Sequence, residues 1–260
     1  MQLNIQEILE FAKQIAIQGG KIAMEYYGSA LKITHKDVIN NLVTEADLTV
    51  ENYLIDQISN KFPTHQIIAE ESGISNKKNE YTWLIDPIDG TTNFAHNYPF
   101  FAISIGLYKE NTGILGVIFA PKLNELFYGT PEASYLNNQQ IKVSKCSSLE
   151  LSLLGTGFPP NRSSEDYSKS IQLFTRTQRN IHGVRRSGSA CLDLCYTACG
   201  RLDGFFEIGL KPWDTGAGTI ILQGAGGRVT DFDNQKFSPY GNTIIATNSQ
   251  IHEELFKFLQ

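Results

Sequence analysis

The sequence of 260 residues lacks several features that would assign it quickly to a class of protein. No apolar run approaches the ~18 residues needed to cross a bilayer, and residues 1–20 lack the basic start of a secretory signal. The formal net charge is −5, so the chain has no overall attraction for nucleic acid or an anionic membrane. We therefore expect a cytoplasmic protein with no membrane partner, and nucleic-acid binding is the less favoured prediction.

Motifs of common catalytic sites are also missing. The phosphate-binding pattern GxxxxGK[ST] fails because Gly20-Lys21 is followed by Ile22, and no GxSxG motif supplies a serine nucleophile. The 4 cysteines do not have C-x2-C spacing, and the 5 histidines show no ligand spacing. We interpret the cysteines as reduced core residues. Zinc is therefore disfavoured.

What is present is the composition of a folded globular protein, with 41% hydrophobic residues and 22 glycines. Apolar periodicity predicts helices over 4–27 and 46–61, short strands at 66–69 and 82–85, and an antiparallel meander over 100–143. Helices and strands alternate again after residue 146. This pattern favours an α/β protein with mixed sheets covered by helices. We place its two lobes at 1–145 and 146–260, packed as one compact unit.

The segment Trp83–Phe94, WLIDPIDGTTNF, is the most informative part of the sequence. A buried strand delivers Asp86 to Pro87, where we expect the chain to turn, and Asp89 follows three residues later. The small and capping residues from Gly90 onward suit a helix start, whose free N–H groups and positive dipole end favour phosphate. Two carboxylates and an anion-binding segment are therefore predicted side by side.

Further acids stand at the boundaries of other predicted elements. Glu70 and Glu71 end the strand before this segment, and Asp214 follows Lys211-Pro212-Trp213, with Glu207 seven residues earlier. Two like charges ~4 Å apart repel by roughly 4 kcal/mol at an effective dielectric constant of 20, so a cluster needs protons or bound cations. Hard oxygen ligands without paired cysteine or histidine select Mg²⁺ or Mn²⁺.

Taken together, several motifs resemble those of the inositol monophosphatase family. They occur in the family's order and span nearly the whole chain: LVTEAD at 42–47, EES at 70–72, WLIDPIDGTTNF at 83–94, GSA at 188–190, FFE at 205–207 and PWDTGAG at 212–218. The resemblance implies a layered αβαβα sandwich. It also implies a Mg²⁺-dependent, lithium-sensitive phosphatase of small phosphate monoesters, usually a homodimer.

The resemblance further implies a role for individual residues, with up to three Mg²⁺ ions. The first ion would be held by Glu70, Asp86, the carbonyl of Ile88 and the hydroxyl of Thr91. The second ion would be held by Asp86, Asp89 and Asp214, and Glu70 would help to hold a third. Asp47 would pair with Thr91 to orient and deprotonate the attacking water.

The same resemblance assigns the substrate contacts. The N–H groups of Gly90 and Thr91 would bind the phosphate. The hydroxyl groups of the substrate would contact Asp89, Gly188, Ser189, Ala190, Glu207 and Asp214. Ser189 replaces a threonine that is common in relatives, and it keeps the hydroxyl.

Several alternatives stay open at this point. The substrate could be inositol 1-phosphate or a related polyol phosphate, fructose 1,6-bisphosphate, histidinol phosphate or a 3′(2′),5′-bisphosphate nucleotide, although Thr92-Asn93-Phe94 favours the inositol type. Some bacterial relatives bind the transcription machinery, so an added antitermination role with RNA polymerase as partner is a second class. The basic concentration at Arg176, Arg179, Arg185 and Arg186 could face phosphate, a second subunit or RNA. Trp213 is expected to pack and position Asp214 rather than to touch substrate.

Overall fold

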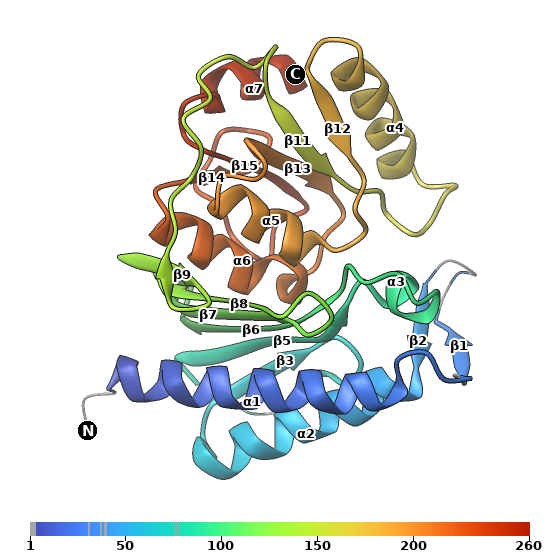
Figure 1. Ribbon diagram of the computed structural model, residues 1–260, viewed down its shortest axis with the longest axis vertical. Helices are drawn as coiled ribbons and strands as arrows, with labels where there is room; N and C mark the ends of the chain where they lie inside the picture. The colour runs from blue at the N-terminus through green and yellow to red at the C-terminus, as the bar shows by residue number, and fades with distance from the viewer. Residues whose placement is uncertain (1–3, 31, 37, 39–40, 76, 78) are drawn as a thin grey trace.

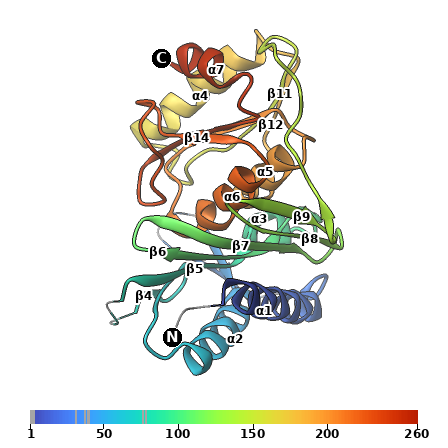
Figure 2. The ribbon, with the colours of Figure 1, turned by 90° about the vertical axis from the view of Figure 1, so that its left-hand side faces the viewer.

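The computed structural model describes residues 4–30, 32–36, 38, 41–75, 77 and 79–260. Helices and sheets alternate in five layers, with one sheet on either side of a central pair of helices (Figure 1). The view turned by 90° shows the same order of layers (Figure 2). The predicted α/β architecture and αβαβα layering are therefore confirmed. Within the described residues, no helix is both long and apolar enough to cross a membrane.

The first sheet has eight strands, and α1 (Ile5–Tyr26) and α2 (Glu45–Lys61) cover one of its faces (Figure 1). Its strands are β3 (Gln66–Ala69), β4 (Gly73–Ile74), β5 (Tyr81–Asp89), β6 (Ala102–Lys109), β7 (Thr112–Ala120), β8 (Glu125–Thr130), β9 (Ala133–Leu136) and β10 (Gln139–Gln140). The order is β10-β9-β8-β7-β6-β5-β3-β4. Only β3 and β5 are parallel neighbours in this sheet.

The second sheet has five strands in the order β12-β11-β13-β15-β14. These strands are β11 (Leu153–Thr156), β12 (Gly183–Arg185), β13 (Gly204–Ile208), β14 (Arg228–Thr230) and β15 (Thr243–Thr247). The central layer between the two sheets consists of α5 (Ala190–Ala198) and α6 (Pro212–Gly224), and the outer layer consists of α4 (Glu165–Gln178) and α7 (His252–Leu259) (Figure 2). β11 runs parallel to both of its neighbours, so the carboxyl ends of β11, β12 and β13 lie at one edge.

Local sequence signals explain several element ends. Asn4 caps α1, with its side chain accepting a hydrogen bond from the N–H of Glu7, and Gly28 follows the helix with a φ of +84°. In the meander, Asn137 and Asn138 form the turn before β10 with φ values of 47° and 68°. The predicted helix start, helix end and hairpin turn are therefore confirmed.

Some elements differ from the sequence-based expectation. The short hairpin of β1 (Ile33–His35) and β2 (Leu42–Thr44) was not predicted, because three-residue strands are too short to show an alternating pattern. The strand expected to end at Asp86 instead continues to Asp89. The prediction that Pro87 turns the chain out of the sheet was therefore wrong. The ladder to β6 accommodates the proline by a register shift between Asp86 and Asp89.

Candidate active site

The end of β5 carries the first two carboxylates of the site. Ile85 and Ile88 are fully buried in the core cluster that the sheet shares with α1 and α2. The N–H of Ile88 donates to Asp86 Oδ1 at 3.0 Å, so this side chain folds back on the irregular part of the strand. The register shift lies between the two acids, and the strand continues through it from Asp86 to Asp89. Asp86 and Asp89 are therefore both delivered by rigid, buried backbone.

Gly90 connects β5 to the short helix α3 (Thr91–Ala95) with a φ of +94°. A Cβ atom at this position would lie 3.0 Å from the carbonyl oxygen of Phe100 and 3.2 Å from that of Gly188. Glycine is needed both for the left-handed backbone and for this close approach. Asn93 holds the same junction, because its Nδ2 donates to the carbonyl oxygens of Phe100 at 2.7 Å and Ser187 at 2.9 Å. The two halves of the chain therefore meet at the start of α3.

Thr91 and Asp47 are in direct contact behind this junction. Thr91 Oγ1 lies 3.2 Å from Asp47 Oδ1 and 3.1 Å from the carbonyl oxygen of Ile88. Asp47 Oδ2 accepts hydrogen bonds from the N–H and hydroxyl of Thr44, which form the capping box of α2. Burial raises the pKa of Asp47 to about 6, against the opposing effect of the Thr44 hydrogen bonds. The structure thus brings together the pair that the resemblance named.

Glu70 follows β3 directly and faces Lys36. Lys36 Nζ lies 2.8 Å from Glu70 Oε1 and 2.6 Å from Glu71 Oε1. The backbone after the strand is fixed by Glu51 of α2, whose carboxylate accepts hydrogen bonds of 2.8 Å from the N–H groups of Glu71 and Ser72. Burial raises the pKa of Glu71 to about 7, although the hydrogen bond from Lys36 opposes this effect. Lys36 therefore offsets part of the acidic charge at this side of the site.

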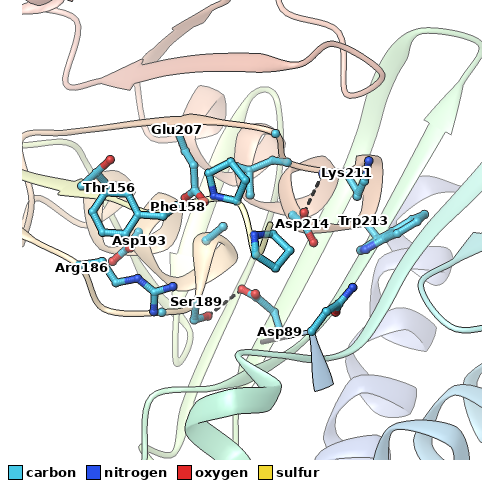
Figure 3. Close-up of a pocket in the computed structure, with 18 of the residues that line it drawn as sticks. Asp89, Thr156, Phe158, Arg186, Ser189, Asp193, Glu207, Lys211, Trp213 and Asp214 are labelled. Atoms are coloured by element: carbon cyan, nitrogen blue, oxygen red, sulfur yellow. Dashed lines mark hydrogen bonds between the residues drawn. The ribbon is translucent and has the colours of Figure 1, made fainter. Parts of the chain in front are cut away.

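Asp89 joins the first sheet to the N-terminus of α5. Its Oδ2 accepts a 2.7 Å hydrogen bond from Ser189 Oγ (Figure 3). The same oxygen accepts a 2.7 Å hydrogen bond from the N–H of Cys191. Ser189 is the N-cap residue of α5, so the carboxylate lies where the helix dipole and an unpaired N–H favour negative charge. Burial still raises the pKa of Asp89 above its usual value, because these hydrogen bonds offset only part of the desolvation cost. The contact leaves Oδ1 available to the site.

Asp214 and Glu207 come from the second half of the chain. Asp214 lies in the first turn of α6, and its Oδ2 accepts a 2.7 Å hydrogen bond from the N–H of Lys211 (Figure 3). Glu207 lies on β13 opposite Gly157, where a Cβ atom would stand 2.3 Å from Glu207 Oε2. The Glu207 carboxylate therefore occupies space that exists only because residue 157 is glycine.

Asp193 is a buried acid of the site that the sequence analysis missed. It lies on α5 beside Gly155 of β11, where a Cβ atom would be 3.2 Å from Asp193 Cγ. Its Oδ1 atom is buried and has no hydrogen-bond partner in the described part of the chain. Burial raises the pKa of Asp193 well above its usual value, against the effects of Ser187 and Arg186. An acid within the otherwise apolar helix was the only signal in the sequence.

These side chains surround one cavity of about 300 Å³ between the two sheets (Figure 3). Its walls include seven of the residues named by the resemblance, namely Glu70, Asp89, Gly188, Ser189, Ala190, Glu207 and Asp214. Asp47, Asp86, Ile88, Gly90 and Thr91 are not among the residues that line it. Residues that the analysis did not assign to the site also line it, among them Thr156, Phe158, Arg186 and Lys211. Trp213 packs on the cluster around Leu84 and also reaches the cavity.

The buried carboxylates repel one another electrostatically. Burial raises the pKa of Asp86 well above its usual range, and Glu70, Asp89 and Asp214 raise it further. Burial, followed by the charges of Asp89 and Glu70, also raises the pKa of Asp214 well above its usual range. Each of these acids therefore lies close enough to the others to share the electrostatic cost of ionisation.

The chemistry of this donor set fits a hard divalent cation, because the ligands are carboxylate, carbonyl and hydroxyl oxygens. Among the described residues, no three Asp, Glu, His or Cys side chains already have the spacing of a completed metal centre. The Glu70 carboxylate instead contacts Lys36, and one oxygen of Asp89 and of Asp214 accepts protein hydrogen bonds. Metal binding therefore requires these side chains to turn toward a shared ion.

Comparison with known proteins identifies the family. Residues 4–260 match the profile of the inositol monophosphatase family. The chain belongs to this family. The inositol-1-monophosphatase of Synechocystis sp. is 41% identical over 261 residues, covering 98% of this chain and 90% of the relative. The fructose-1,6-bisphosphatase/inositol-1-monophosphatase of Aquifex aeolicus is 36% identical over 254 residues, covering 96% and 94%.

A solved structure agrees with this assignment. The inositol monophosphatase of Anabaena (Nostoc) sp. matches with a TM-score of 0.89 and 41% identity, covering 99% of this chain and 96% of that one. The predicted membership of the inositol monophosphatase family is confirmed, and the chain is a phosphatase. The family is generally metal-dependent, which agrees with the oxygen donors around the cavity.

Proposed function

We propose that this member of the inositol monophosphatase family hydrolyses inositol 1-phosphate and related polyol or sugar monophosphates to the alcohol and inorganic phosphate. The proposal includes two to three Mg²⁺ ions, for which Mn²⁺ could substitute. The observation that carries it is the convergence of Glu70, Asp89 and Asp214 from three separate segments on one cavity. Five carboxylates line this cavity among the described residues, against the three cations Lys36, Arg186 and Lys211, so a divalent ion would stabilise the folded site.

The ions would be held by Glu70, Asp86, Asp89 and Asp214, with the Ile88 carbonyl and the Thr91 hydroxyl. When bound, Mg²⁺ would neutralise the phosphoryl oxygens and stabilise the departing oxygen of the alcohol. Asp47 accepts a proton through Thr91 Oγ1, and the pair thereby orients the attacking water. The 3.2 Å contact between Thr91 Oγ1 and Asp47 Oδ1 supports this role. The N–H groups of Gly90 and Thr91 bind the phosphate.

The alcohol side of the substrate lies against the second sheet. Glu207 and the start of α5 face the cavity there, so their carboxylate and backbone groups bind hydroxyl groups of the substrate. Gly188 and Ala190 contribute backbone groups, and the Ser189 hydroxyl accepts from the substrate while it donates to Asp89. This arrangement favours a leaving group with several hydroxyls over an apolar alcohol.

We further propose that the enzyme is a cytoplasmic homodimer inhibited by Li⁺. The support is the resemblance of its motifs to the family. Nucleic acid or RNA polymerase remains a less favoured partner, because the net charge is −5 and the arginines of the basic segment 176–186 contact different parts of the molecule. Arg176 stacks on Phe258 and Arg185 donates to a backbone carbonyl, whereas Arg186 faces the cavity.

A phosphate-release panel tests the activity. It would compare inositol 1-phosphate, sugar phosphates, fructose 1,6-bisphosphate and nucleotide phosphates at several Mg²⁺ concentrations. We expect polyol monophosphates to give the highest kcat/KM and turnover to vanish in EDTA. Activity that persists in EDTA, or that is confined to nucleotides, contradicts the proposal.

A further inference from the structure

Asp193 is a buried acid in the wall of the proposed reaction cavity, and it has no part in the proposed hydrolytic chemistry. Its Oδ1 atom is shielded from bulk solvent, and no residue that the structure describes donates a hydrogen bond to it. A buried polar atom without a partner is destabilising, and such atoms are rare in folded proteins. Because Asp193 lines the cavity, we expect its missing partner to come from a molecule bound there.

Two glycines make room for Asp193 and for its neighbour Glu207. Gly155 lies in β11 and Gly157 follows the strand, so the two positions face the same side. A Cβ atom at residue 155 would lie 3.2 Å from Asp193 Cγ, and one at residue 157 would lie 2.3 Å from Glu207 Oε2. Burial raises the pKa of Glu207 well above its usual value, and the nearby charges of Asp214 and Asp193 raise it further. The backbone of residues 155–157 is thus shaped to hold two neighbouring acids.

Asp193 lies one helical turn along α5 from the contact between Ser189 and Asp89. The N–H of Asp193 donates to the carbonyl oxygen of Ser189 at 3.1 Å. Four residues of α-helix advance about 6 Å. Figure 3 shows Asp193 toward Arg186, on the side of the cavity away from Trp213. A group bound to Asp193 is therefore about one helical turn further along the wall than a group bound to Ser189.

The surroundings of Asp193 favour a neutral hydroxyl group over a cationic one. Burial raises the pKa of Asp193 well above its usual value, and Ser187 and Arg186 offset only part of that rise. The side chain is therefore protonated more readily than a free carboxyl group. A hydroxyl group can donate to the ionised form and accept from the protonated form, whereas an ammonium group pairs only with the ionised form. The charge of Arg186 also repels a cation at this place.

We propose that Asp193 is a substrate-binding residue that, beside Glu207, binds a hydroxyl group of the leaving alcohol remote from the ester oxygen. The inference rests on the proposed hydrolytic function and deepens it. A cyclitol or a hexitol is long enough to place such a hydroxyl one helical turn beyond Ser189. In glycerol 2-phosphate both hydroxyls stand next to the ester carbon, so they do not reach Asp193. Asp193 therefore selects the larger polyols.

The diagnostic variant is Asp193→Ala. Phosphate release in Mg²⁺ would be measured with inositol 1-phosphate and glycerol 2-phosphate for the wild type and the variant. We expect the ratio of kcat/KM values, inositol over glycerol, to fall at least about threefold, as the loss of a hydrogen bond implies. Displacement of α5 alone would lower both values together and leave the ratio unchanged. Asp193→Asn should keep most of the ratio, because an amide both donates to and accepts from a hydroxyl group.

Thr197→Ala is the matched control, because Thr197 is buried one turn further along the same helix. Its hydroxyl donates to the carbonyl oxygen of Asp193 at 2.9 Å, and it is not among the described residues that line the cavity. This variant should leave the ratio at the wild-type value. If Asp193→Ala does not fold, the same ratio is measured for Asp193→Leu, which fills the volume, and for Gly155→Ala, which displaces Asp193.

A smaller fall in the ratio overturns the proposal, as does an equal fall in Asp193→Asn or Thr197→Ala. A wild type with the higher kcat/KM for glycerol 2-phosphate also overturns it. If the wild type hydrolyses neither substrate, the proposed function fails separately. Asp193 is then judged by calorimetric binding of the two phosphates in Mg²⁺ to the wild type and Asp193→Ala. An unchanged ratio of affinities, or no binding of either phosphate to the wild type, overturns its role.

Discussion

Asp89 Oδ2 accepts a hydrogen bond from Ser189 Oγ at 2.7 Å, so a carboxylate of the first sheet caps the helix that begins the second half of the site. This contact joins residues 100 positions apart in the sequence. It fixes the side chain proposed to hold the metal relative to the wall proposed to hold the alcohol. The contact can be tested by changing Ser189, which leaves Asp89 in place.

We predict that Ser189→Ala lowers the free energy of unfolding by about 1.5–3 kcal/mol, because a buried carboxylate loses a charged hydrogen bond. Urea denaturation measures this change. Ser147→Ala, which alters an exposed serine, is the control and should stay within ~0.5 kcal/mol of the wild type. A Ser189→Ala variant as stable as the control would show that the cap contributes nothing to stability.

We predict that Mg²⁺ stabilises the protein more at pH 8 than at pH 5. Burial raises the pKa values of Asp86 and Asp214, so the folded chain binds more protons than the unfolded chain above pH ~4. Stability in EDTA therefore decreases as pH rises from 5 to 8, and Mg²⁺ offsets that loss. Thermal melts with Mg²⁺ or EDTA at the two pH values measure the effect. Equal Mg²⁺-induced shifts at both values would contradict it.

Asp214→Asn tests the effect of the Asp214 charge on stability and Mg²⁺ binding. In EDTA at pH 8 we expect this variant to be more stable than the wild type by roughly 1–2 kcal/mol, because one like charge is removed while the cap oxygen remains. In Mg²⁺ its thermal shift should be smaller than that of the wild type, and its turnover should fall by orders of magnitude. Asp56→Asn, on the exposed side of α2, is the control and should change none of these three properties.

The pair of Asp47 and Thr91 predicts an acid limb in the pH profile. Burial raises the pKa of Asp47 to about 6, so the carboxylate is protonated below that pH and no longer accepts the Thr91 proton. We expect kcat/KM to decline as pH falls through about 6. Thr91→Ser should keep the limb and most of the activity, whereas Thr91→Ala should lose most of the activity. A profile of the wild type that is flat from pH 5 to 7 is the contrary result.

Gly157→Ala tests the position of Glu207. The added methyl would lie 2.3 Å from Glu207 Oε2, so the carboxylate must move away from the cavity. We expect kcat/KM for a polyol monophosphate to drop roughly tenfold or more with the fold retained. Gly183→Ala in β12 is the matched control, since its nearest neighbour is the flexible end of Arg185 at 3.2 Å. Equal activity of the two variants would remove Glu207 from the substrate site.

The sequence was informative where local pattern and chemistry coincide. The apolar run before Asp86 predicted a buried strand, and Gly90 with the following threonines predicted a helix start, which is α3. The path through Pro87 was missed, because only pairing with β6 shows that the ladder can absorb a proline by shifting register. The sequence around Pro87 predicts a turn, but pairing with β6 keeps the residue in the strand.

The second half of the site was less accessible to sequence reasoning. Arg186 follows β12, and Asp193 lies on α5, the next element after it. Both reach the cavity because β11 pairs in parallel with β12 and β13, which places the segments after these strands together. No spacing within the sequence encodes that pairing. Gly157 illustrates the same limit, since its importance depends on a carboxylate 50 residues away.

The division of the cavity between separate stretches of chain has a consequence for how such an enzyme can evolve. The acids proposed to hold metal lie on β5 and α6 or directly after β3, whereas residues 156–160 line another part of the cavity wall. Insertions or substitutions in that wall can therefore alter which alcohol is accepted while the hydrolytic apparatus is inherited unchanged. Substrate range and chemistry can diverge at independent rates in different lineages.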